Sequence, residues 1–195
     1  MERCPGAVKR PWWWLAAGAR LGLWAAFSLP AREVTVNDQI LQQLADRAAI
    51  SDVVHRYATA IDLRDWALLR TCFSDPVEAD FTSFGVRDVF RGGADDWVAA
   101  VRSTIEGLDA TQHLTANHVH EISGDSAVCT AYIRARHVFD EADGENSYTI
   151  GGYYTWELAR QDDGWRASKY AINVTWKSGN RHILKQAARK FAGKS

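Results

Sequence analysis

The chain has 195 residues, of which 47% are hydrophobic and 24% charged, and its formal net charge is −1. These values are ordinary for a globular protein, and the length favours a single domain. A nearly neutral chain gives no reason to expect nucleic acid or an anionic membrane as a partner. The three cysteines, Cys4, Cys72 and Cys129, are too few and too far apart for a disulfide framework or a zinc site. They favour a reducing compartment, and we expect a cytoplasmic protein.

The first 33 residues differ in composition from the rest of the chain. Basic residues precede an apolar run over residues 11–29 that includes Trp12-Trp-Trp14. This arrangement is typical of a signal peptide, but Arg20 interrupts the run, so no apolar stretch long enough for a membrane span is present. Three interpretations stay open: a start codon assigned too early, with Val34 as the true beginning; a targeting segment; or a structural arm. We expect residues 1–33 to be a poorly structured extension.

Helical patterns dominate the chain from Val34 to about residue 108. Asn37 or Asp38 can cap a first helix that continues to Ile61, with a kink or second cap at Ser51-Asp52. Asp65 can cap a short second helix over 66–72, and a third helix is expected over about 96–108. Between the second and third helices, Val77–Phe84 has the pattern of a strand.

Strand patterns follow from Gln112 onward, over residues 112–122, 126–139, 147–160 and 165–176. Helices followed by an antiparallel meander predict an α+β fold, with the domain over residues 34–177. Residues 178–195 are a basic C-terminal tail in which a short helix, His182 to Phe191, is expected.

One acid lies on the apolar side of the first helix. Buried positions at helical spacing include Val54, Tyr57 and Ala58, and Asp62 follows Ala58 by four residues. A carboxylate aimed into an apolar interior is costly unless it is paired. His113 and His137 are available as partners, and an Asp that orients a His makes the imidazole a base that works near neutral pH. The alternative is that Asp62 is an ordinary helix-end acid and that Tyr57 only packs in the core.

The pattern of the second long strand predicts which side of the sheet His137 faces. Every second residue before it is small or apolar, whereas Arg134 and Arg136 occupy the other face. His137 is therefore expected to face inward, as a core residue or a functional one. The alternation around His113 is mixed and predicts no direction.

Four separated motifs make the chain similar to a known family. They are Asp62-Leu-Arg-Asp-Trp66, Asp80-Phe-Thr-Ser-Phe84, Thr111-Gln-His113 and the inner His137. In this order and spacing they resemble scytalone dehydratases, which are SnoaL-like domains of the NTF2-like superfamily. Tyr57, five residues before the acid, is similar to a position in the bile-acid dehydratases of the same fold.

The resemblance implies an NTF2-like cone in which N-terminal helices pack on a strongly curved antiparallel sheet around an apolar cavity. It implies Asp62, His113 and His137 as catalytic residues and Tyr57, Phe81, Tyr153 and Thr155 as substrate-binding residues. Relatives of this kind are commonly dimers or trimers. Two tyrosines of scytalone dehydratases are replaced here by Ile61 and Phe81. The proton-transfer residues are thus retained and the carbonyl-polarising ones are not, so the substrate is expected to differ from scytalone.

No metal or other cofactor is expected. His118-x-His120 would place two imidazoles on one face of a strand, but the sequence offers no third ligand at metal-site spacing. Glycine-rich phosphate loops, nucleophile elbows and cysteine–base pairs are absent from the sequence.

The predicted function is a cofactor-independent dehydratase or isomerase for a small hydrophobic polyketide, steroid or aromatic substrate. His113, oriented by Asp62, would remove a proton, and His137 or Tyr57 would position or protonate the oxygen. Three alternatives stay open: a proton shuttle by Asp62 itself, a non-catalytic carrier or sensor, and an interaction subunit. A homo-oligomer without stable membrane insertion is expected.

Overall fold

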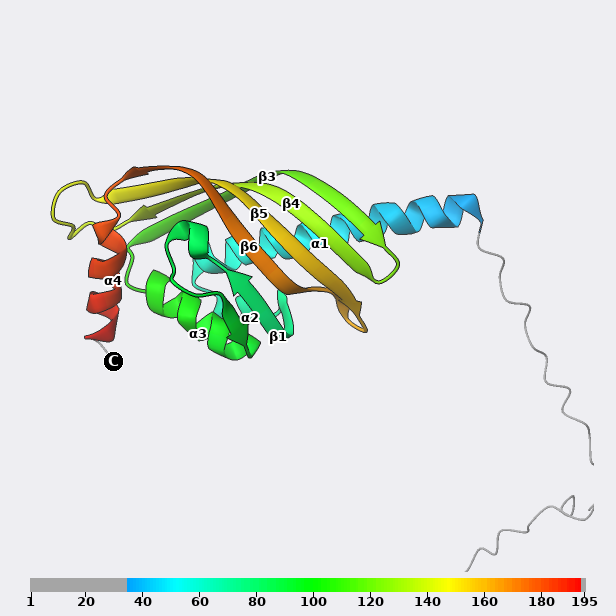
Figure 1. Ribbon diagram of the computed structural model, residues 1–195, viewed down its shortest axis with the longest axis horizontal. Helices are drawn as coiled ribbons and strands as arrows, with labels where there is room; N and C mark the ends of the chain where they lie inside the picture. Colours follow the sequence, from blue (N-terminus) through cyan, green and yellow to red (C-terminus); the bar gives the residue numbers. More distant parts are fainter. Residues whose placement is uncertain (1–34, 194–195) are drawn as a thin grey trace, which may run out of the picture. The chain divides into compact units, whose positions relative to one another are not determined.

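The computed structural model describes residues 35–193 (Figure 1). The predictions for residues 1–33 lie outside this range. The helices are α1 (Val36–Leu63), α2 (Trp66–Arg70), α3 (Ala94–Ile105) and α4 (His182–Ala192), with a 3₁₀ turn, η1 (Thr82–Phe84). The strands are β1 (Phe73–Asp80), β2 (Phe90–Gly92), β3 (Ala110–Ser123), β4 (Ser126–Val138), β5 (Ser147–Gln161) and β6 (Gly164–Gly179). Among the described residues, no helix is long and apolar enough to cross a membrane.

Helix α1 begins earlier in the chain than predicted. Thr35 is the N-cap: its hydroxyl accepts a hydrogen bond from the Asp38 backbone N–H, and the Asp38 carboxylate accepts one from the Thr35 backbone N–H. This capping box satisfies two free N–H groups of the first turn. The prediction of Asn37 or Asp38 as N-cap was therefore wrong. The helix runs unbroken through the predicted second cap at Ser51-Asp52.

The core-facing part of α1 starts near Asp46. Ile40, Leu41 and Leu44, which continue the apolar spacing, are exposed because the first turns of the helix extend beyond the sheet (Figure 1). Asp46 is buried and accepts two hydrogen bonds from the Arg160 guanidinium, at 2.7 and 2.8 Å, and one from the Trp165 indole at 3.1 Å. The Arg160 contacts, which outweigh burial, lower the pKa of Asp46 to about 2. This charged pair fixes the helix against β5 and β6.

The six strands form one open sheet in the order β2-β1-β6-β5-β4-β3. The four predicted long strands are confirmed and pair as antiparallel neighbours. The strand predicted at Val77–Phe84 lies earlier, at Phe73–Asp80, because Asp80 accepts hydrogen bonds from the Thr82 N–H and hydroxyl and turns the chain into η1. Strand β1 pairs parallel with β6, so the sheet is mixed, with the predicted antiparallel strands as its main part.

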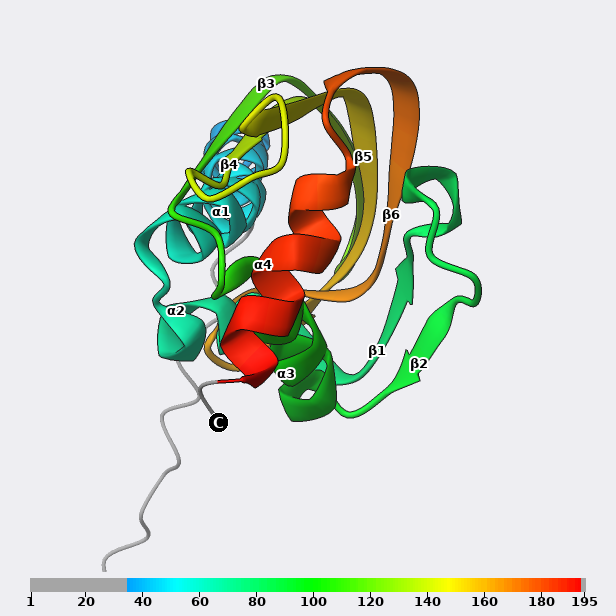
Figure 2. The same cartoon turned by 90° about the vertical axis from the view of Figure 1, so that its left-hand side faces the viewer.

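The long strands curve over the helices, and α4 crosses in front of α3 in the view of Figure 2. The predicted short helix in the basic C-terminal segment is confirmed as α4, and its Ile183, Leu184 and Ala187 are buried. Close packing of α4 requires a glycine just after α3, because a Cβ on Gly107 would overlap the Ala187 carbonyl. Segment 182–192 is thus part of the packed domain.

A β-bulge in β3 reverses which residues face the core. Strand β3 pairs regularly with β4 up to Ala116 and again from Val119, and the extra residue lies between them. Asn117 occupies the left-handed region there, with φ of 53°. Odd-numbered residues such as His113 face inward before the bulge, and even-numbered residues such as His120 face inward after it. This reversal explains the mixed alternation of the sequence.

Candidate active site

An apolar cavity of about 320 Å³ lies between the helices and the concave face of the sheet. Its size falls at the lower end of the range for small-molecule sites. Apolar side chains from several elements form most of the wall, including Ile61, Phe81, Trp97, Ile150, Ile172 and Leu184. The polar groups that reach it include His113, His137, Tyr57 and Tyr154.

His113 and Asp62 form a hydrogen-bonded pair at this cavity. Nδ1 of His113 lies 2.7 Å from Oδ1 of Asp62, and the His113 backbone N–H donates to Oδ2 over 2.7 Å. The His113 side chain is 5% exposed and that of Asp62 is 23% exposed. An ionised carboxylate fixes the ring with its proton on Nδ1, which leaves the lone pair of Nε2 free. Asp62 is behind His113 and is not itself part of the cavity wall.

Thr111 holds the carboxylate of Asp62, and Arg64 in turn holds Thr111. The Thr111 hydroxyl donates to Oδ1 over 2.9 Å, and the Arg64 guanidinium donates to the Thr111 hydroxyl over 2.8 Å. Burial favours the neutral acid, but the hydrogen bonds and charge of His113, with the Thr111 hydroxyl, outweigh it and lower the pKa of Asp62. The carboxylate is therefore charged at neutral pH and can stabilise an imidazolium at His113.

His137 lies beside His113, with ring centroids 5.7 Å apart in an edge-to-face arrangement. Its inward direction was predicted correctly: it is 3% exposed. Its Nδ1–H donates to the Tyr148 carbonyl over 3.3 Å. Burial, then the neighbouring His113, lowers the pKa of His137 to about 4. His137 is thus neutral near pH 7 and offers Nε2 as a hydrogen-bond acceptor.

Two side chains of the cavity wall, Trp97 and Tyr57, are linked through the hydroxyl of Tyr170. The Trp97 indole N–H donates to the Tyr170 hydroxyl over 2.7 Å, and the Tyr170 hydroxyl lies 3.5 Å from that of Tyr57. Tyr154 packs edge-to-face on Tyr57, with centroids 5.7 Å apart. Burial raises the pKa of each of these tyrosines well above its usual value. The phenols remain protonated and can act as hydrogen-bond donors.

Of the four predicted substrate-binding residues, the structure places Tyr57 and Phe81 in the cavity wall. The inward direction expected for Tyr153 and Thr155 was wrong. Tyr154 is the inward residue of β5, since it pairs with the buried Ala131 of β4, and Tyr153 is exposed on the outer face. The resemblance to the family was aligned with β5 one residue out of register. Because neighbouring residues of a strand face opposite sides of the sheet, this shift assigned the wrong face to both residues.

Sequence reasoning missed Arg64, Trp97 and Tyr154. The alternation of buried residues along β5 could have found Tyr154. Nothing in the sequence pattern indicates Arg64, which ends α1 in the left-handed region, with φ of 60°, and hydrogen bonds to the Ile61 and Leu108 carbonyls. Arg64 can support Thr111 only because the end of α1 lies close to the start of β3 in the folded protein.

The fold and the buried pair define a class: α+β domains in which a curved sheet and helices enclose a small-molecule cavity with an acid–histidine pair. A family model described as the SnoaL-like domain matches residues 42–171, so the chain belongs to this family. Its fold is the NTF2-like cone.

Solved structures agree with this assignment. A protein from Kribbella flavida is 31% identical, with 73% of this chain and 99% of that chain covered and a TM-score of 0.70. The hexachlorocyclohexane dehydrochlorinase LinA-type3 from Novosphingobium barchaimii is 25% identical, with 74% and 96% covered and a TM-score of 0.61. A protein provisionally named a scytalone dehydratase, from Novosphingobium aromaticivorans, is 15% identical, with 73% and 92% covered and a TM-score of 0.65; at this identity it shows the fold alone. A comparison with curated proteins finds no match.

Proposed function

We propose that this protein is a lyase or isomerase that uses the His113–Asp62 pair to remove a proton from carbon in a small hydrophobic substrate. The observation that carries the proposal is the 2.7 Å contact between the two side chains at the wall of an apolar cavity. Dehydrochlorinase activity in the name of a 25% identical relative is consistent with a C–H abstraction on this scaffold.

His113 is the base in this proposal. Its Nε2 takes the proton from a carbon next to a carbonyl or aromatic ring, and the Asp62 carboxylate stabilises the resulting imidazolium. The C–H electrons form a new C=C bond. In a dehydration, the neighbouring C–O bond breaks, and the hydroxide leaves with the proton that His113 received, as water. In an isomerisation, His113 returns the proton to a different carbon.

His137 serves as a positioning group in this scheme. Because its pKa is lowered to about 4, it holds no proton to donate from Nε2 near pH 7. Nε2 instead accepts a hydrogen bond from a substrate hydroxyl and aligns it for departure. Tyr57 and Tyr154 are the proposed donors to a substrate carbonyl oxygen, in place of the tyrosines that Ile61 and Phe81 replace. Oriented donors in a dry cavity stabilise charge that develops on that oxygen.

The size and lining of the cavity favour a substrate with one or two rings. The ring-rich wall of Phe81, Trp97 and Tyr154 suits a flat aromatic or polyketide-like molecule with an oxygen at one end. A carrier would need the same apolar wall but would not need the pair of His113 and Asp62.

A screen of hydroxylated ketones, phenolic polyketides and steroids tests the proposal. With any substrate found, His113→Ala should lower turnover by about 10²- to 10⁴-fold, the usual contribution of a positioned base. Asp62→Asn should also lower it, because an amide holds the ring but does not stabilise its charged form. The double variant should be little worse than His113→Ala, since the two residues act as one unit.

His182→Ala and Asp52→Asn are matched controls, because both residues are exposed and outside the cavity wall. They should keep wild-type turnover. Full activity in His113→Ala would refute the proposed base. Tight binding of hydrophobic ligands without turnover, equal in wild type and His113→Ala, would favour the carrier.

We also propose that the protein forms a homo-oligomer through the outer face of the sheet. Leu114, Tyr132, Tyr153 and Trp176 lie on adjacent strands and are 54%, 59%, 37% and 47% exposed. A continuous exposed patch with two tyrosines and a tryptophan is typical of a protein interface. A second copy of the chain is the proposed occupant.

A further inference from the structure

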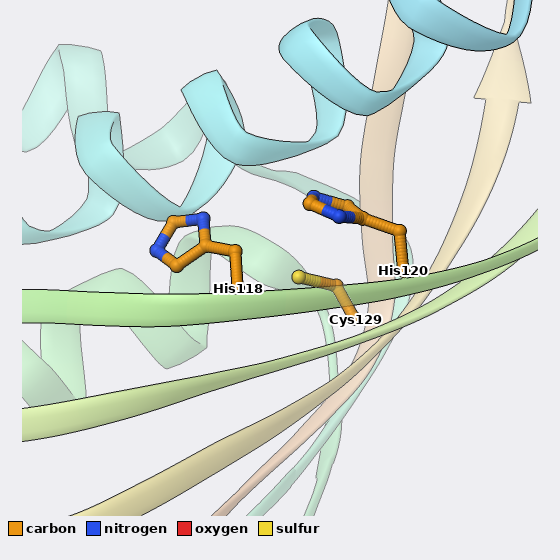
Figure 3. Close-up of side chains that lie close together, drawn as sticks. All are labelled: His118, His120 and Cys129. Carbon is orange, nitrogen blue, oxygen red and sulfur yellow. The ribbon is translucent and has the colours of Figure 1, made fainter.

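A second group of histidines lies outside the cavity wall. His118 and His120 project from β3 and Cys129 from β4, all toward the side on which α1 lies (Figure 3). One potential ligand atom of each residue lies within 4.8 Å of the others. None of the three lines the cavity described above, and the proposed proton transfer uses none of them.

The bulge in β3 brings the three residues together. Without the extra residue, His118 and His120 would face outward, as Ala116 does before the bulge. With it, His120 is the direct partner of Cys129 across the β3–β4 pair, and His118 follows two residues away on the same face. The third ligand that the sequence did not reveal thus comes from a neighbouring strand.

Each imidazole has one nitrogen bonded and one left over. The Ser51 hydroxyl of α1 lies 3.0 Å from Nδ1 of His118 and 2.9 Å from Nε2 of His120. Nε2 of His118 and Nδ1 of His120 are buried and have no hydrogen-bond partner. The nitrogens that converge on the Ser51 hydroxyl are the ones placed to share a ligand, because Nε2 of His118 points away from His120 and Cys129 (Figure 3).

Metal binding requires neutral imidazoles and a thiolate, so a bound cation would displace the proton of the Cys129 thiol. The Cys129 thiol donates one long hydrogen bond, 3.7 Å, to the Thr130 carbonyl.

We propose that His118, His120 and Cys129 bind a zinc-like divalent cation between α1 and the sheet. Two imidazoles and a thiolate are a ligand set that zinc prefers. Metal–ligand bonds of about 2.0 to 2.3 Å require ligand atoms closer together than 4.8 Å, so the side chains must close by about 1 Å. The Ser51 hydroxyl or a water supplies the fourth position. The bound cation would link α1 to β3 and β4 and so stabilise the fold.

Cobalt titration of the metal-free full-length protein tests this proposal. Co²⁺ replaces zinc in such sites, and coordination by Cys129 should give a thiolate-to-cobalt charge-transfer band in the near ultraviolet, which stoichiometric Zn²⁺ should abolish. Zn²⁺ should also raise the unfolding midpoint, since a ligand that binds only the folded state stabilises it.

Variants identify the ligands. Cys129→Ala should remove the charge-transfer band, and His118→Gln or His120→Gln should weaken Co²⁺ binding by more than about tenfold, because losing a ligand costs more than losing a group that supports one. Cys72→Ala is the matched control, since Cys72 is also a buried free cysteine but lies outside the cluster. Cys4→Ser excludes the remaining thiol. Both control variants should keep the band.

Two results would overturn the proposal. One is the absence of a charge-transfer band in the wild type; the other is a band that persists in a folded Cys129→Ala. If Cys129→Ala fails to fold, His118→Gln decides through the unfolding midpoint: a rise with Zn²⁺ equal to that of the wild type contradicts the site. The cluster would then be a packing motif held by the Ser51 hydroxyl alone.

Discussion

At the scale of single residues, the surroundings of a side chain decide its chemistry. His113 and His137 are adjacent histidines, but Asp62 contacts only the first and a backbone carbonyl contacts the second. The Asp62 carboxylate lies beside the ring of His113, whereas burial keeps His137 neutral. Different surroundings of this kind are what would let one histidine act as the proposed base and the other as an uncharged acceptor.

The lowered pKa of His137 predicts how stability depends on pH. The group titrates near 6.5 in the unfolded chain and at about 4 in the folded one. Between these values the unfolded state binds more protons, so the free energy of unfolding falls as pH drops from about 6.5 to about 4, by about 3 kcal/mol from this group. His137→Gln should lack this part of the decrease in urea unfolding curves measured across that range.

The control for this prediction is His182→Ala, which removes an exposed histidine and should follow the wild-type pH dependence. Parallel curves for wild type and His137→Gln would show that His137 titrates normally in the folded protein.

At the scale of elements, the bulge of β3 places both candidate sites. It allows His113 before the bulge and His118 and His120 after it to face the same side of the sheet. Asn117 adopts the left-handed conformation that makes the bulge, and asparagine tolerates this region better than most residues.

The effect of a substitution at Asn117 on stability should depend on how well the new residue tolerates the left-handed backbone conformation. Asn117→Gly should change the free energy of unfolding by a few tenths of a kcal/mol at most, whereas Asn117→Val should lower it by about 1–3 kcal/mol, because a β-branched residue is strained at positive φ. Urea denaturation measures both. Glu121→Val, at an exposed position of the same strand, controls for the valine itself. Equal effects of the two valine substitutions would contradict the role of Asn117.

At the scale of the whole molecule, the sheet has one face packed on the helices and one face exposed. The outer face carries Leu114, Tyr132, Tyr153 and Trp176, the proposed interface between copies. If the interface exists, Tyr132→Arg should lower the molecular mass measured by sedimentation velocity at micromolar concentration, since a buried unpaired charge is costly. Asp52→Arg, at an exposed position of α1, should leave the mass unchanged. A monomeric wild type would contradict the proposal.

The sequence by itself predicted the main helices, the four long strands and the acid–histidine motif, because helical and strand periodicities are local properties of the chain. Asp62 was found from its place on the stripe of α1, and the inward direction of His137 from the regular alternation along β4. Tertiary structure decided what depends on pairing between distant segments: the parallel contact of β1 with β6, the support of Asp62 by Arg64 and Thr111, and the meeting of His120 with Cys129. Register decided the face of Tyr153 and Thr155, and one extra residue at Asn117 decided that of His118 and His120. Because a shift of one residue turns a strand side chain to the other face, such assignments require the paired sheet.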